Sequence, residues 1–396
     1  MKNRILLYLT ALLGLVSCSK AYYDMGSPSE AAYKMDGMSS MGGNGQGRPG
    51  GRAGVLTAGE WNDLDHWGFW SGLMTSDTFQ GISDYWRFYT PRRVAVRVAD
   101  ASGARLPGVK IVLEQEQTAI WSTVTDNMGE ASLWVDPFHG QAGTDNLAIT
   151  IDGVRQEGAP KVTSWNVQQE EPEVNFYVIN RAPGTEKRAD IAFIVDATGS
   201  MGDEIAFLRK DLMDILDRVI NGQGEIALRT GAVFYRDEGD AYLTKHSDFT
   251  QDYRETIKYI SMQEAGGGGD LPEAVHTALE AGLQNLSWNT SARARIAFLI
   301  LDAPAHQDHQ GVVESLQKSV EAYAAMGIKL IPVFCSSPSK ECEFMCRFFA
   351  ICTGGTYVFL TDDSGVGGDH IEASVGQFQV EPLNDLLVRL IAKYIG

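Results

Sequence analysis

The chain has 396 residues, of which 44% are hydrophobic, so it is long enough to form more than one domain with a buried core. Its 51 acidic residues outnumber its 33 basic residues and give a net charge of -18. Nucleic-acid phosphates require concentrated lysine and arginine, so this balance argues against a protein that binds DNA or RNA. Cations and basic partners are favoured instead.

Residues 1–18 are typical of an export signal. A basic start precedes an apolar run from Ile5 to Val16, which is too short to span a bilayer. The ending Leu-Val-Ser-Cys resembles the bacterial lipobox, in which the cysteine is lipidated. We therefore expect an exported lipoprotein anchored through Cys18 to the cell envelope, at the outer membrane and facing the periplasm or the surface. A plain signal peptide is the alternative.

The next two stretches differ sharply in composition. Residues 19–55 are rich in glycine, serine and methionine, which indicates a flexible tether. Residues 56–90 hold a dense group of tryptophans, namely Trp61, Trp67, Trp70 and Trp86. We expect these rings to pack a short helical segment against a neighbouring domain, because an exposed aromatic surface of that size, the alternative, would promote aggregation.

Residues 91–180 show apolar residues at every second position, for example in Val94–Val98 and Val174–Val178. This pattern, broken by turn signals such as Asp-Asn-Met-Gly, predicts a small antiparallel β-sandwich. The segments beginning at Val98 and Thr123 resemble the carboxypeptidase regulatory-like and immunoglobulin-like modules of bacterial surface proteins. That resemblance implies a spacer without chemistry of its own.

Strands and helices alternate through residues 188–396, which predicts an α/β fold with a doubly wound, Rossmann-like parallel sheet. Four cysteines fall close together in this part of the chain. Outside the cytoplasm they predict two disulfides, with buried free thiols or a zinc site as alternatives. The residues concerned are Cys335, Cys342, Cys346 and Cys352.

Oxygen-bearing side chains follow the first strand of this region. The buried run Ile191–Val195 leads into Asp196, Thr198 and Ser200, and the carboxyl edge of such a sheet is where ligands bind. Hard divalent cations prefer oxygen ligands, so the pattern predicts a site for Mg²⁺, Mn²⁺ or Ca²⁺. A strand end followed by a helix cap is the structural alternative.

The Asp-Ala-Thr-Gly-Ser motif resembles the metal-ion-dependent adhesion site of von Willebrand factor type A domains. The resemblance implies that Asp302, at the end of a second strand, also contributes to the site. Where that family usually offers a threonine, this chain has Gly269 and Asp270, so Asp270 is a candidate ligand. It further implies a non-catalytic protein that binds an acidic residue of a protein partner through the cation.

Acidic loops after other strands supply candidates for the rim that contacts the partner, namely Asp237, His306, Asp362 and Asp363. His306, Asp308 and His309 also resemble ligands for a transition metal. A zinc hydrolase needs a third convergent ligand and an activated water, which favours binding over catalysis. The competing function is a structural envelope component in which the metal only staples the sheet edge.

Overall fold

The computed structural model describes residues 56–165, 171–182, 184, 187–224, 226–269, 271–337, 339–362 and 371–396, and these all belong to one compact unit. The expectations for Cys18, the tether, Asp270 and Asp363 lie outside the described residues. Within them, none of the helices combines the length and the apolar character that crossing a membrane requires.

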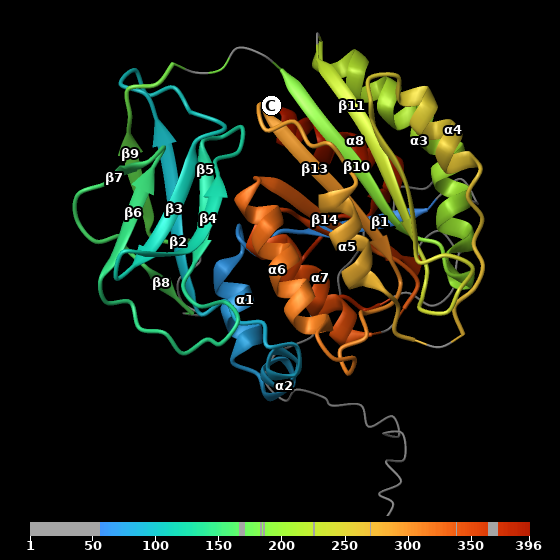
Figure 1. The fold of residues 1–396 in the computed structure, drawn as a ribbon, viewed down its shortest axis with the longest axis horizontal. Helices are drawn as coiled ribbons and strands as arrows, with labels where there is room; N and C mark the ends of the chain where they lie inside the picture. The colour runs from blue at the N-terminus through green and yellow to red at the C-terminus, as the bar shows by residue number, and fades with distance from the viewer. Residues whose placement is uncertain are drawn as a thin grey trace, which may run out of the picture. The chain divides into compact units, whose positions relative to one another are not determined.

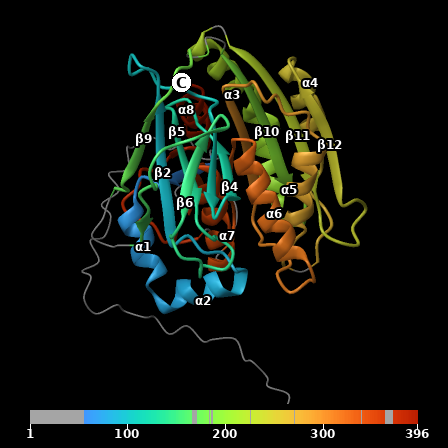
Figure 2. The same cartoon turned by 60° about the vertical axis from the view of Figure 1, so that its left-hand side comes forward.

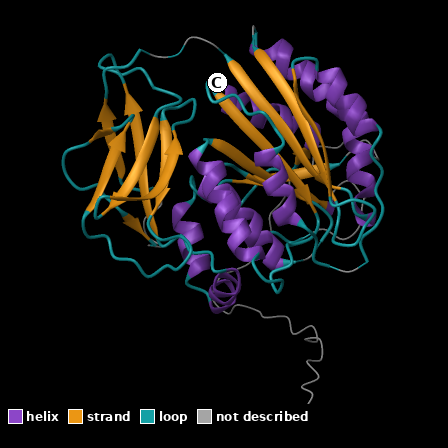
Figure 3. Ribbon diagram, viewed as in Figure 1, coloured by secondary structure: helices purple, strands orange, loops and turns teal. Residues whose placement is uncertain are grey.

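An eight-stranded sheet forms the centre of the α/β part (Figure 1, Figure 3). Its inner strands are buried apolar runs that pair in parallel, as expected for strands covered on both faces. The order across the sheet is β12 (Thr244–Thr250), β11 (Ala227–Tyr235), β10 (Arg188–Asp196), β13 (Ala294–Leu301), β14 (Ile328–Phe334), β15 (Tyr357–Thr361), β1 (Thr57–Trp61) and β16 (Glu381–Pro382).

The sheet is mixed rather than wholly parallel, which corrects the prediction. β12 runs antiparallel to β11 at one edge, and β1 runs antiparallel to β15 and β16 at the other. Because Thr57–Trp61 supplies a strand of this sheet, residues 56–90 are not a separate segment. The α/β part therefore begins at β1, is interrupted by the smaller sheets and resumes at β10.

Helices cover both faces of the sheet (Figure 3). One face carries a hydrophobic cluster to which α3 (Gly202–Gln223), α4 (Tyr253–Ser261) and α8 (Leu383–Ile395) contribute. The other carries α5 (Val275–Gln284), α6 (Val312–Ala325) and α7 (Lys340–Thr353). A short 3₁₀ turn, Gly199–Met201, leads from β10 into α3.

The aromatic segment forms α1 (Trp67–Met74) and α2 (Asp77–Trp86), and α2 packs against α7. All four of its tryptophans are buried, as the packing interpretation predicts. Phe88 stacks on Phe348 of α7 with ring centroids 4.2 Å apart. The buried guanidinium of Arg347, which precedes Phe348 in α7, pairs with Asp63 at 2.6 Å. Apolar packing and this ion pair join the segment to α7.

Residues 92–178 form two four-stranded sheets (Figure 2). Their inward side chains belong to the same hydrophobic cluster as α6 and α7. The assignment of this part to an immunoglobulin-like or regulatory-like sandwich stays a prediction. The first sheet contains β5 (Glu130–Trp134), β2 (Arg92–Ala99), β8 (Thr163–Ser164) and β9 (Val174–Val178); the second contains β4 (Thr118–Val124), β3 (Lys110–Gln115), β6 (Leu147–Ile151) and β7 (Val154–Arg155).

The predicted disulfides are wrong, because Cys335, Cys342, Cys346 and Cys352 are all free and buried. Three of them lie on the single helix α7 and point into the core between that helix and the sheet. Buried free cysteines such as these act as small hydrophobic side chains of the core. Burial raises the pKa of the Cys352 thiol well above its usual range, so it stays protonated.

Candidate functional site

The site lies where β10 and β13 end. These strands are parallel neighbours, so Asp196 at the end of β10 and Asp302 just after β13 reach the same edge of the sheet. Both side chains are buried. Two carboxylates therefore share a region from which water is largely excluded.

The loop after β10 brings three of the predicted residues together. The backbone N and the Oγ1 of Thr198 donate to Asp196 Oδ1 at 2.8 and 2.7 Å. Burial raises the pKa of the Asp302 carboxyl, and the hydroxyl of exposed Ser200 opposes that rise. The predicted set Asp196, Thr198, Ser200 and Asp302 thus converges on one place.

A glycine-rich loop before α5 closes over this point. Gly199 N donates to Gly267 O at 3.1 Å, and Gly266 N donates to Ala197 O at 3.0 Å, so the two loops are hydrogen-bonded along their backbones. Gly268 has a φ of +66°, and a Cβ placed on it would lie 3.1 Å from Glu273 Oε1 and 3.2 Å from Thr198 Cβ. Only glycine fits a position that combines this backbone conformation with so close an approach.

Glu273 is a site residue that the sequence interpretation missed. Its backbone N donates to Pro304 O at 2.9 Å, which places it between the glycine loop and the loop after β13. Its side chain is buried although it reads as an ordinary first-turn glutamate of a helix. Its position four residues after the glycine run that ends at Gly269, just before a helix, is the signal that could have identified it.

The buried carboxylates are short of partners. Each keeps one oxygen without a hydrogen bond in the part of the chain that the structure describes: Asp196 Oδ2, Asp302 Oδ1, Glu273 Oε2 and Glu204 Oε2. Burial raises the pKa of Asp196 to about 7, and burial with the charge of Asp196 raises that of Glu273 to about 9. Clustered carboxylates repel one another unless a cation or a proton is shared, so this oxygen set fits a hard divalent cation.

The predicted rim residues lie in different surroundings. Asp237 and His306 are not exposed at a rim but form a buried pair, with His306 Nε2 2.6 Å from Asp237 Oδ1. Asp362, which follows β15, is exposed. Asp237 is near enough to add to the raised pKa of Glu273, so the pair borders the carboxylate cluster.

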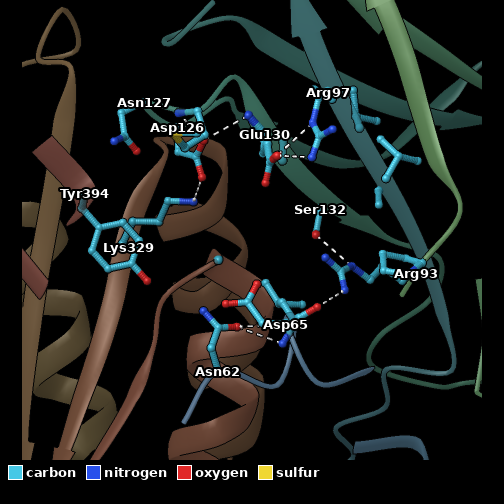
Figure 4. Close-up of a pocket in the computed structure, with 18 of the residues that line it drawn as sticks. Asn62, Asp65, Arg93, Arg97, Asp126, Asn127, Glu130, Ser132, Lys329 and Tyr394 are labelled. Atoms are coloured by element: carbon cyan, nitrogen blue, oxygen red, sulfur yellow. Dashed lines mark hydrogen bonds and ion pairs between the residues drawn. The ribbon is translucent and has the colours of Figure 1, made fainter. Parts of the chain in front are cut away.

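A separate polar pocket of about 450 Å³ lies where β2 and β5 meet the loop after β1 and α8 (Figure 4). Arg97 pairs with Glu130 at 2.5 Å and Lys329 with Asp126 at 3.6 Å. Arg93, whose pKa burial lowers to about 10, donates to Leu64 O at 2.8 Å. Because its charges largely compensate one another, this pocket does not select an anion by net charge.

Residues 190–329 match the family model described as the von Willebrand factor A domain. The match supports a von Willebrand factor A domain in this part of the chain. It covers the loops that carry Asp196, Glu273 and Asp302. The match agrees with the α/β fold and the mixed sheet.

Two curated proteins are similar to this chain over stretches of nearly equal length. An ariadne-like RING finger protein of Acanthamoeba polyphaga mimivirus is 34% identical over 117 residues, which are 30% of this chain and 11% of that protein. An alpha-protein kinase of Dictyostelium discoideum is 29% identical over 119 residues, 30% of this chain and 19% of that protein. The chain thus spans only a small part of the length of these relatives.

Solved structures with similar chains include BatB from Bacteroides thetaiotaomicron, at 15% identity and a TM-score of 0.35, with 52% of this chain and 98% of that chain covered. The pilus adhesin SpaC from Lactobacillus rhamnosus GG, in its open conformation, is 13% identical with a TM-score of 0.39 and covers 54% of this chain and 30% of that chain.

Proposed function

We propose that this protein binds a protein partner through one divalent cation, Mg²⁺ or else Mn²⁺ or Ca²⁺, held at the carboxyl edge of the sheet. The observation that carries the proposal is the set of buried carboxylate oxygens, among them one each of Asp196 and Asp302, that have no hydrogen-bond partner among the described residues. Oxygen donors of this kind suit hard cations. The residues that would hold the ion are Asp196, Thr198, Ser200, Asp302 and Glu273, with Asp270 as a further candidate.

The side chains of the site have distinct roles in this proposal. Thr198 holds Asp196 Oδ1 through two hydrogen bonds and thereby aims Oδ2 at the ion. Exposed Ser200 lies on the solvent side, beside Asp302. When bound, the cation supplies a strong local positive charge with a coordination position open to a carboxylate of the partner. Loops around it then select the partner by shape.

The cellular setting is part of the same proposal. A lipid on Cys18 and a tether over residues 19–55 would hold the protein at the bacterial cell envelope, and the two smaller sheets would act as a spacer. The net charge of -18 supports a protein partner over nucleic acid. The partner is a protein that presents an acidic residue.

Catalysis is less well supported than binding. The buried acids have raised pKa values, as catalytic acids often do. A cation site accounts both for these raised pKa values and for the unpartnered oxygens of the described residues. The remaining alternative is a structural role, in which the ion only holds the loops together and contacts no partner. The experiments below separate these functions.

Calorimetric titration of Mg²⁺ and Mn²⁺ into the purified protein tests the metal site. We expect one ion per chain, with affinity lowered at least tenfold in Asp196→Asn and in Glu273→Gln. Asp203→Asn is the matched control, because Asp203 is an exposed acid in the first turn of α3. Asp270→Asn tests the remaining candidate ligand. Unchanged affinity in Asp196→Asn would refute the site.

Peptide arrays that differ only by glutamate or glutamine test the partner chemistry. Binding should require both Mg²⁺ and the carboxylate, and chelation should release the peptide while the circular dichroism spectrum stays unchanged. If chelation instead unfolds the protein and no acidic peptide binds, the ion is a structural staple and the binding function is wrong.

A further inference from the structure

A histidine-rich turn follows β13 beside the carboxylate cluster. His306, Asp308 and His309 each place a ligand atom within 4.8 Å of those of the other two. The rings of His306 and His309 stack with centroids 4.3 Å apart and an angle of 5° between their planes. Asp308 and His309 are exposed, whereas His306 is only 5% exposed. One fixed ligand and two adjustable ones therefore share this turn.

The fixed ligand is already oriented for coordination. His306 Nε2 lies 2.6 Å from Asp237 Oδ1, and a carboxylate accepts, so in the neutral imidazole Nε2 carries the proton and Nδ1 keeps the lone pair. That contact is the only hydrogen bond of the ring within the described residues, which leaves Nδ1 open. A carboxylate behind a histidine is the arrangement that orients metal-bound imidazoles in proteins and makes them more basic.

We propose that His306, Asp308 and His309 form a second metal site, which takes a borderline transition metal such as Zn²⁺ and leaves a coordination position open. Two imidazoles and one carboxylate are a donor set typical of Zn²⁺, whereas the oxygen-only cluster suits Mg²⁺. Ligands around zinc bond at roughly 2.0–2.2 Å, so the three atoms must draw closer together on binding. The His306 and His309 rings are parallel and their lone pairs lie in the ring planes, so the exposed His309 ring must also turn for both nitrogens to meet one ion.

The surroundings of His309 agree with this assignment. Its Nδ1 lies 3.8 Å from Glu238 Oε2, so Glu238 faces one nitrogen of the ring and Nε2 remains for the metal. Asp237 and Glu238 follow β11 in sequence, so the loop after that strand places one carboxylate near each imidazole. The site therefore draws its ligands from one loop and its supporting carboxylates from another.

Cobalt is the probe for the test, because Co²⁺ in a protein site of low coordination number absorbs strongly in the visible range, whereas the hydrated ion absorbs weakly. The purified protein is titrated with Co²⁺ in excess Mg²⁺, which fills the oxygen site. We expect strong visible bands at one Co²⁺ per chain and their loss when Zn²⁺ is added. His309→Ala and Asp308→Asn, both on the surface, should weaken Co²⁺ binding at least tenfold.

His246→Ala is the matched control, since His246 is an exposed histidine of the edge strand β12. The bands should persist in that variant and also in Asp196→Asn, which disables the oxygen site. Weak absorption like that of the hydrated ion, or equal binding by His309→Ala and the unaltered protein, would overturn the proposal. Loss of the bands in Asp196→Asn would show that the two metal sites are not separate and would overturn it as well.

Discussion

The buried ion pair between Asp63 and Arg347 ties the amino-terminal segment to α7. Arg347 is fully buried, and its Nε and Nη2 donate to the two carboxylate oxygens of Asp63 at 2.9 and 2.6 Å. Its Nη1 donates to Ser374 O at 2.6 Å and to Glu343 Oε1 at 3.2 Å. The Asp63→Asn change leaves the buried guanidinium charge in place and removes the anion that pairs with two of its nitrogens.

Removing one partner of a buried ion pair costs about 3–5 kcal/mol of unfolding free energy. Because Glu343 stays beside Arg347, we expect the lower end of that range for Asp63→Asn. A control pair joins the same segment to α6 at the surface: Arg87 and Glu314 lie 2.8 Å apart with side chains 47% and 50% exposed. Water screens such a pair, so Glu314→Gln should leave the stability almost unchanged.

Urea denaturation measured in parallel by tryptophan fluorescence and far-ultraviolet circular dichroism checks both variants. Coincident transitions would show that the amino-terminal segment and the α/β part unfold together. If Asp63→Asn unfolds at the same urea concentration as Glu314→Gln, the buried pair does not hold the amino-terminal segment to α7. The prediction that this pair stabilises the fold is then refuted.

Three further predictions concern the site and the cysteines. In the metal-free protein the folded-state pKa values of Asp196 and Glu273, about 7 and about 9, lie above the ordinary 3.8 and 4.5. The folded state therefore holds these two protons more tightly than the unfolded state, and the free energy of unfolding falls as the pH rises from the ordinary values to the raised ones. The increase in melting temperature on adding Mg²⁺ should therefore be larger near pH 8.5 than near pH 5.5, and an equal increase at both would contradict the shared-cation interpretation. Gly268→Ala places a Cβ in a left-handed backbone conformation against Glu273, so we expect lower Mg²⁺ affinity and a stability loss of about 1 kcal/mol, with Gly269→Ala as the calorimetric control. Alkylation without reductant should modify none of the four core thiols in the folded protein and all of them in urea, as mass spectrometry would show; protection in urea would indicate disulfides at Cys335, Cys342, Cys346 and Cys352.

Local sequence signals were sufficient for the parts of the fold that bury continuous apolar runs. Ile191–Val195 reads as a covered strand because a strand buried on both faces needs apolar residues at every position, and it forms the centre of β10. Asp196, Thr198 and Ser200 were identifiable because they follow that strand directly. Asp302 was identifiable for the same reason after β13.

Pairing between distant segments was not available from local patterns. Thr57–Trp61 has neither a long apolar run nor a clear alternation, and it becomes a strand because β15 offers it hydrogen-bond partners about 300 residues further along the chain. The spacing of Cys342 and Cys346, four residues apart, places them on one face of a helix, but only the packing of α7 shows that this face is buried, and the sequence interpretation favoured disulfides instead.

The sequence by itself determined the class of the α/β part and most residues of the candidate oxygen site, because both depend on what immediately follows a buried strand. The tertiary structure alone decided that Glu273 is buried near enough to Asp196 and Asp302 to feel their charges, and that Asp237 pairs with His306. Burial and the approach of separate loops create the raised pKa values and the unpartnered oxygens, and those properties arise only once the loops have packed together.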